Sequence, residues 1–119
     1  MNGSAIGVGK AERLKKSSDF RVVLQKGRFW ADDLMGIRAR PNAQGITRIG
    51  LITSKKIGKA VVRNRVKRLL REASKPLPIA PGWDIVIIAR QAAAEAPYRE
   101  IEACLRKLLK RANLLGEDG

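Results

Sequence analysis

The sequence predicts an α+β domain in which helices pack on a small β-sheet. Apolar residues recur at helical spacing over residues 62–73 and 98–112. Two short apolar-rich segments, 34–40 and 46–53, flank a polar turn, as strands of a sheet do. A third segment, 83–90, is almost continuously apolar and β-branched, which is typical of a strand in the middle of a sheet. Helices and strands in this mixture indicate an α+β sandwich.

The chain of 119 residues is long enough for one domain that folds without disulfides. Residues 1–11 contain three glycines and little to bury, so they are predicted to form a disordered tail. The domain is expected to span 12–115, and 116–119 is expected to be a second disordered tail.

The first half is expected to contain one helix and two or three strands. Ser17 or Ser18 can cap a helix that stops at Gly27. Residues 28–33 are predicted to be a short strand or turn. The segments on either side of the polar turn at 41–45 are expected to pair with each other as a hairpin.

The second half is expected to contain the interior strand and a last helix. Prolines and a glycine between residues 76 and 82 prevent the preceding helix from continuing. Pro97 suits the first turn of a helix that extends to about Leu115. The predicted buried stripe of this helix consists of Tyr98, Ile101, Leu105, Leu108, Leu109 and Ala112.

Composition narrows the function to binding a polyanion. The formal net charge is +14 and the pI is near 11.0. A membrane partner is disfavoured, because no apolar run approaches ~20 residues and aromatic residues make up only 4% of the chain. The chain has no histidine and one cysteine, which excludes an internal disulfide, paired zinc motifs and imidazole chemistry. Cys104 is predicted to pack as a small apolar residue.

Residues 1–10 lack the apolar core of an export signal, so a cytoplasmic location is expected.

One helix combines an apolar stripe with a basic face. On a helical wheel, Val62, Val66, Leu69, Leu70 and Ala73 fall within roughly a 100° arc. The rest of the surface is basic, with nine Lys or Arg and one acid between residues 55 and 75. A merely solvated face usually mixes both signs. The one-sided charge therefore indicates an anionic partner, and its arginines match phosphate geometry.

The basic stretch resembles the signature of the bacterial ribonuclease P protein subunit family. The matching pieces are Ser-Lys-Lys-Ile-Gly at 54–58, Ala-Val at 60–61, Arg-Asn-Arg at 63–65, Lys-Arg at 67–68 and Arg71. Three weaker pieces agree in order: Arg-Leu-Lys-Lys at 13–16 with Asp-Phe at 19–20, Gly-Trp-Asp at 82–84, and Ile-Ile-Ala-Arg at 87–90. The resemblance covers about residues 13–112.

The resemblance implies a fold of αβββαβα type, with a small mixed sheet and a left-handed βαβ crossover around the basic helix. It also implies that the chain is the small subunit of a ribonucleoprotein endoribonuclease that removes the 5′ leader from precursor tRNA. In such an enzyme the RNA subunit carries out the hydrolysis with bound Mg²⁺. The expected partners are the catalytic RNA and precursor tRNA, and neither a protein partner nor a catalytic or metal-binding side chain is expected.

The resemblance further implies two groups of RNA-binding residues. The group expected to contact the catalytic RNA comprises Lys55, Lys56, Lys59, Arg63, Asn64, Arg65, Lys67, Arg68 and Arg71. The group expected at a leader-binding cleft, between the first helix and the sheet, comprises Arg13, Lys15, Lys16, Phe20, Arg21, Leu24, Arg38 and Arg90. Leu24 and Arg38 stand where relatives commonly have aromatic residues, so Phe20 is the clear stacking residue.

Two other functions compete with this interpretation. A ribosomal or RNA-chaperone protein needs the same charge but not the ordered Arg-Asn-Arg motif at 63–65. A metal-dependent nuclease acting alone would use Asp19, Asp32, Asp33 or Asp84. The adjacent pair Asp32 and Asp33 could hold a hydrated Mg²⁺, although turn formation explains it more simply.

Overall fold

A computed structural model describes residues 11–116, so nearly all of both predicted tails lies outside the described residues. The domain has three α-helices and a five-stranded mixed sheet. The helices are α1 (Ser17–Lys26), α2 (Ala60–Ser74) and α3 (Tyr98–Arg111), with short 3₁₀ helices η1 (Lys55–Ile57) and η2 (Gln91–Glu95). The strands are β1 (Glu12–Arg13), β2 (Arg28–Ala31), β3 (Met35–Pro41), β4 (Arg48–Ile52) and β5 (Trp83–Ala89). The predicted α+β class and the αβββαβα order are confirmed, with β1 as an additional short strand that was not predicted.

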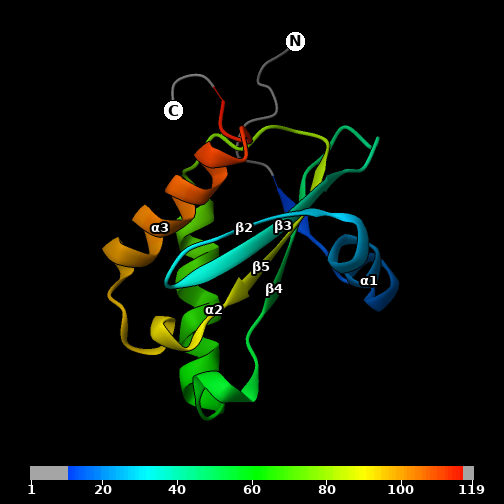
Figure 1. Cartoon of the computed structure of the whole chain (residues 1–119). Coiled ribbons are helices and arrows are strands. Elements are labelled where there is room, and N and C mark those ends of the chain that lie inside the picture. The colour runs from blue at the N-terminus through cyan, green and yellow to red at the C-terminus, as the bar shows by residue number, and fades with distance from the viewer. Residues whose placement is uncertain (1–10, 117–119) are drawn as a thin grey trace.

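β5 lies in the middle of the sheet, as its apolar sequence predicted. The strand order is β1-β4-β5-β3-β2, with β5 antiparallel to β3 and parallel to β4. Figure 1 shows α1 on one face of this sheet and α2 with α3 on the other. The chain passes from β4 through α2 to the adjacent parallel strand β5, so α2 belongs to a crossover connection. The left hand of this crossover stays a prediction.

The predicted hairpin between the third and fourth strands is wrong. β3 and β4 do not pair with each other, because β5 lies between them and bonds to both. Their connecting loop instead crosses the end of β5, where the Asn42 N–H donates to the carbonyl oxygen of Gly82 at 2.9 Å. β5 is buried on both faces, so the central position covers more apolar surface than a local hairpin would.

The sheet separates two apolar clusters. The larger one joins the sheet to α2 and α3 and contains Ile37, Ile85 and Ile87. The smaller one joins it to α1 and contains Leu14, Val23 and Val86, with Phe20 and Leu24 partly buried at its edge. Alternate residues of β3 and β5 thus serve opposite clusters, as strand geometry requires.

The predicted apolar stripe of α2 is confirmed. Val66, Leu70 and Ala73 are buried, while Val62 and Leu69 pack partly buried against the same core. η1 precedes this helix, and the Ser54 hydroxyl at its start accepts a hydrogen bond from the Lys56 N–H at 3.3 Å. The stripe fixes which face of α2 remains outside, and that face carries the basic residues.

Three details of the helix ends differ from the prediction. α1 begins at Ser17 directly after Lys16, and no side chain caps its first turn. α3 ends at Arg111 rather than near Leu115, because Asn113 has a left-handed φ of 61° and the chain then turns to bridge Ile79. Tyr98 was expected in the buried stripe but is 38% exposed, since it stands in the first turn, where α3 only begins to meet the core.

Candidate nucleic-acid interface

η1 and the outer face of α2 form one continuous basic surface. Lys55, Lys56, Lys59, Asn64, Arg68 and Arg71 are exposed, and Arg63, Arg65 and Lys67 are half-buried. Within residues 11–116, none of the nine Lys or Arg residues between 55 and 75 forms an ion pair. This surface, called here the α2 basic face, therefore keeps its positive charge uncompensated by the protein.

Two arginines of this face also hold the backbone. The Arg63 Nε donates to the carbonyl oxygen of Gly58 at 3.2 Å, which ties the start of α2 to the turn before it. The Arg65 guanidinium donates to the carbonyl oxygens of Ala94 at 3.0 Å and Ala96 at 3.2 Å. Arg65 thus connects α2 to η2, a structural role that the sequence did not reveal.

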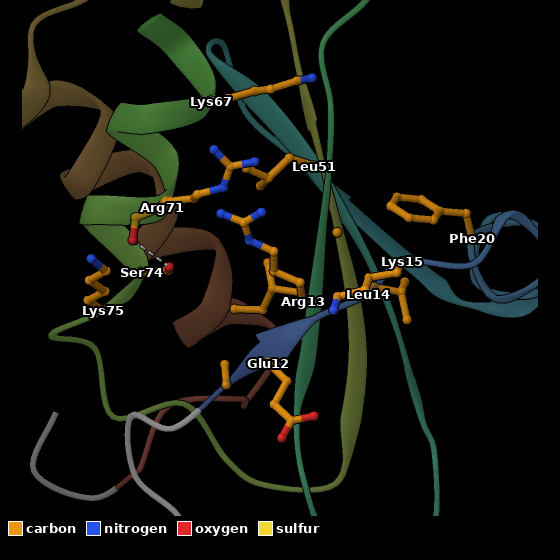
Figure 2. Close-up of a pocket in the computed structure, with 13 residues that line it drawn as sticks. Glu12, Arg13, Leu14, Lys15, Phe20, Leu51, Lys67, Arg71, Ser74 and Lys75 are labelled. Carbon is orange, nitrogen blue, oxygen red and sulfur yellow. Dashed lines mark hydrogen bonds between the residues drawn. The ribbon is translucent and has the colours of Figure 1, made fainter. Parts of the chain in front are cut away.

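A pocket of about 460 Å³ lies between the edge of the sheet and α2. Figure 2 shows the guanidinium groups of Arg13 and Arg71 pointing toward one another across it, while Glu12 points away. Lys15 and Lys67 line the same pocket, and Phe20 stands at its rim. The sequence assigned these residues to two separate groups, and the fold brings members of both groups together.

Phe20 lies on the sheet because β4 has a glycine beneath it. A Cβ built on Gly50 would clash with the Phe20 ring, so the ring occupies the space that a larger residue would fill. Leu24, one turn further along α1, is partly buried beside Ile52 and Ile88 of the same sheet face. We call the shallow depression that Phe20 and Leu24 line along α1, beside this sheet face, the α1 cleft.

The other residues predicted at the leader site are spread around the α1 cleft. Lys15, Arg21 and Leu24 line a shallow depression along α1 together with Phe20. Lys16 is exposed immediately before α1. Arg90 is exposed just after β5 and donates to the Asp32 carbonyl oxygen at 3.3 Å. Lys16 and Arg90 thus lie outside the depression that the other four residues share.

Arg38 is half-buried on β3 and is held by two neighbours. Its guanidinium donates to the carbonyl oxygen of Gly27 at 3.2 Å and lies over the ring of Phe29, 4.8 Å from the ring centroid. Phe29 was not predicted as a site residue, although it is 51% exposed. Alternation along β2 was the available signal, because Trp30 packs on the larger core and leaves Phe29 for the opposite face.

Three of the four acidic residues proposed for a nuclease, Asp19, Asp32 and Asp84, are paired with cations, whereas Asp33 forms no ion pair within residues 11–116. Buried Asp84 accepts hydrogen bonds from Arg48 Nε at 2.8 Å and Arg48 Nη2 at 2.7 Å, and a third from Asn42 at 2.8 Å. Burial by itself would raise the pKa of Asp84, but the hydrogen bonds from Arg48 and Asn42 outweigh it and hold that pKa below its ordinary value. Asp19 pairs with the same Arg48 at 3.3 Å.

Asp32 also lies far from Asp84 and Asp19, which share Arg48. Asp84 is opposite Arg40 at one end of the β3–β5 pair, whereas Asp32 follows β2 at the other end and pairs with Lys107. Five residues of strand, roughly 17 Å, separate the two ends. Among residues 11–116, no three His, Cys, Asp or Glu side chains lie close enough together to hold a metal ion.

Comparison with known proteins identifies the family. The model of the ribonuclease P family matches residues 8–113, which is most of the chain. The chain belongs to the ribonuclease P protein family. Two curated ribonuclease P protein components, from Roseiflexus castenholzii and Alkaliphilus oremlandii, are each 41% identical to it. The alignments cover 89% of both chains in the first case, and 87% of this chain and 92% of the relative in the second.

Solved structures of ribonuclease P proteins share the fold. The Staphylococcus aureus protein is 34% identical with a TM-score of 0.80, over 90% of this chain and 100% of the other. The Thermotoga maritima protein is 31% identical with a TM-score of 0.75, over 84% and 96% of the two chains. As a family member, the chain is a component of ribonuclease P, a tRNA-processing ribonucleoprotein endoribonuclease, and its partner is the RNA of that enzyme. Within residues 11–116, no helix is both long and apolar enough to cross a membrane.

Proposed function

We propose that this ribonuclease P protein binds the catalytic RNA through the α2 basic face and the 5′ leader of precursor tRNA in the α1 cleft. In this role it promotes RNA-catalysed removal of the leader to give the mature 5′ end of the tRNA. The observation that carries the proposal is the α2 basic face, whose eight basic residues find no acidic partner within residues 11–116. Phosphates supply the missing countercharge.

The catalytic RNA is expected to contact the exposed part of this face. Lys55, Lys56, Lys59, Arg68 and Arg71 are free to reach phosphates, and exposed Asn64 can add a hydrogen bond. Arg63, Arg65 and Lys67 lie half-buried at its edges. Because Arg63 and Arg65 also bond to backbone carbonyls, they would present their remaining N–H groups in a fixed orientation.

The leader is expected to follow the α1 cleft. Phe20 offers a ring for stacking a base, and the half-buried Leu24 offers an apolar wall. Lys15, Lys16 and Arg21 are exposed beside them and would pair with leader phosphates. The pocket between Arg13 and Arg71 would let one RNA backbone pass from this cleft to the α2 basic face.

In this proposal the RNA carries out the hydrolysis, and RNA oxygens hold most of the Mg²⁺. The reaction takes place in the cytoplasm. Three of the protein's acids do not fit a magnesium site, because Asp84 and Asp19 are both paired with Arg48 at one end of the sheet, while Asp32 is paired with Lys107 at the other end. The protein's own contribution is positioning and countercharge.

A reconstitution experiment tests this function. Purified protein, catalytic RNA and precursor tRNA are mixed at low Mg²⁺, and 5′ cleavage is scored with each component omitted in turn. We expect cleavage to require the RNA and to rise sharply when the protein is added. Cleavage by the protein alone would return the acidic residues to consideration. RNA binding without any stimulation of cleavage would favour the chaperone or ribosomal alternative.

A further inference from the structure

We propose that Phe29, together with Arg38, forms a second stacking site for a base of single-stranded RNA at the far side of the α1 cleft from Phe20. The ligand is the precursor leader, so this inference rests on the function proposed above. It adds a residue on β2 to a site otherwise built from α1 and the basic residues around it.

Phe29 stands on the cleft face of the sheet. It is the cross-strand partner of Arg38 on β3, and Arg38 is in turn opposite Val86 on β5. Val86 belongs to the cluster beneath α1, whereas the neighbours of Arg38 on β3, Ile37 and Ala39, belong to the other core. Paired residues share a face, so Phe29 projects to the α1 side.

The Phe29 ring is held in place although the residue is exposed. A Cβ on Gly36 would lie 2.8 Å from the ring, so the ring lies close against the β3 backbone in space that only glycine leaves open. The Arg38 guanidinium over the ring is itself fixed by its bond to the Gly27 carbonyl oxygen. A preorganised ring spends little conformational entropy when a base stacks on it.

The two phenylalanines are built in the same way. Phe20 lies over Gly50 of β4, and Phe29 lies against Gly36 of β3. These glycines are two strands apart in the sheet order, a separation of roughly 10 Å. Half-buried Ile52 and Ile88 pair with each other and continue the row from Gly36, giving an apolar floor between the rings.

Single-stranded RNA fits this surface better than an apolar protein segment. α1 supplies a single aromatic ring, Phe20, which can stack only one leader base. A second base needs an aromatic ring from elsewhere in the fold. The exposed ring of Phe29 is bordered by the Arg38 guanidinium, and Lys26 and Arg90 are exposed at the nearby ends of α1 and β5. Aromatic rings and arginine planes stack bases, while the cations attract phosphates.

The test uses the reconstituted complex with precursor tRNAs that carry 2-aminopurine at successive leader positions. In the wild type, stacking should quench the fluorescence at one position near Phe20 and at another near Phe29. Phe29→Leu should remove the second quench only. It should also lower the affinity ratio of precursor to mature tRNA by about tenfold, the scale of one lost base stack.

Matched variants separate stacking from folding. Phe29→Trp keeps an aromatic plane and should preserve both the quench and the ratio. Ile46→Ala shortens a side chain of similar exposure, 42%, in the loop between β3 and β4, and should change neither. Arg38→Lys keeps the charge without the planar group and should weaken the same quench as Phe29→Leu. Thermal melts of all variants establish that they fold.

The two proposals fail differently. If wild-type complex does not prefer precursor over mature tRNA, leader binding fails and this inference fails with it. If the wild type shows the preference and Phe20→Ala reduces it, but Phe29→Leu leaves the ratio and every quench unchanged, only the second stacking site is overturned.

Discussion

Arg65 on α2 donates a hydrogen bond of 3.0 Å to the carbonyl oxygen of Ala94 in η2. A second bond to the Ala96 carbonyl oxygen, at 3.2 Å, makes this arginine a brace between the two elements. An arginine of the predicted RNA-binding motif therefore also supports the fold. Substitution of Arg65 should lower both the stability of the protein and its affinity for RNA. Substitution of a residue that only contacts phosphate should lower the affinity alone.

We expect Arg65→Ala to weaken both folding and RNA binding. Loss of two charge-assisted hydrogen bonds should lower the free energy of unfolding by about 1–3 kcal/mol. Arg68→Ala is the matched variant, because the Arg68 side chain is exposed and makes no hydrogen bond within residues 11–116. It should weaken binding to the catalytic RNA while changing stability by no more than about 0.5 kcal/mol. Urea unfolding and filter binding check the pair, and equal stability of both variants would refute the brace.

RNA binding through the α2 basic face should depend steeply on salt. With about six phosphate contacts, affinity should fall on the order of a thousandfold between ~50 and ~200 mM salt. Arg68→Ala should reduce the slope of log affinity against log salt by about 1, since one contact is removed. Titrations at four salt concentrations test this, and a flat response would argue against an electrostatic interface.

Gly50→Ala should displace Phe20. The added Cβ would clash with the ring, so we expect a loss of about 1–3 kcal/mol in the free energy of unfolding. In a Phe20→Ala background there is no ring for the new Cβ to clash with. Gly50→Ala should then lower the free energy of unfolding much less. A double-mutant cycle measured by thermal unfolding gives the coupling directly. Additive costs would mean that the ring does not rest on Gly50.

Local patterns predicted what depends on local sequence. The continuous apolar run of β5 predicted its central place, and the spacing from Val62 to Ala73 predicted the buried stripe of α2. The hairpin failed because its strands separate to admit β5, a segment about 30 residues later in the chain, and no turn signal records that insertion. β1 was missed because two residues give no periodicity.

The same limit applies to the candidate site. Charge and the local motif identified the basic residues of α2, because residue type and order along the chain are enough to find them without any tertiary contact. The pairing of Phe29 with Arg38 depends on the register between the consecutive strands β2 and β3, which composition does not give. Arg13 and Arg71 line one pocket although they lie far apart in the sequence, so only the tertiary fold brings them together.

Cys104 should resist thiol reagents in the folded protein. It is buried in the apolar stripe of α3 beside Leu105 and Leu108, and burial raises the pKa of its thiol, so little thiolate forms. We expect iodoacetamide at pH 8 to modify the native protein at least about tenfold more slowly than the urea-unfolded protein. Mass spectrometry follows the reaction. Comparable rates in the two states would contradict the interpretation of Cys104 as a packing residue.

The ion pair between buried Asp84 and half-buried Arg48 should make stability fall in acid. A carboxyl whose pKa is lower in the folded than in the unfolded state stabilises the protein above its unfolded pKa, and this contribution is lost as the pH falls. The ordinary aspartate value is 3.8, so the loss should begin below about pH 4 and continue toward the lower folded pKa. Asp84→Asn should cost about 2–3 kcal/mol at pH 7, because it leaves Arg48 with Asp19 as its remaining partner. The stability of Asp84→Asn should then decline less steeply than that of the wild type between pH 5 and about pH 2, as measured by urea unfolding at each pH.

Asp33→Asn is the control variant, because it removes an exposed carboxyl that forms no ion pair within residues 11–116, and it should keep the wild-type profile. If Asp84→Asn instead loses stability in acid as steeply as the wild type, other carboxyl groups must govern the acid response.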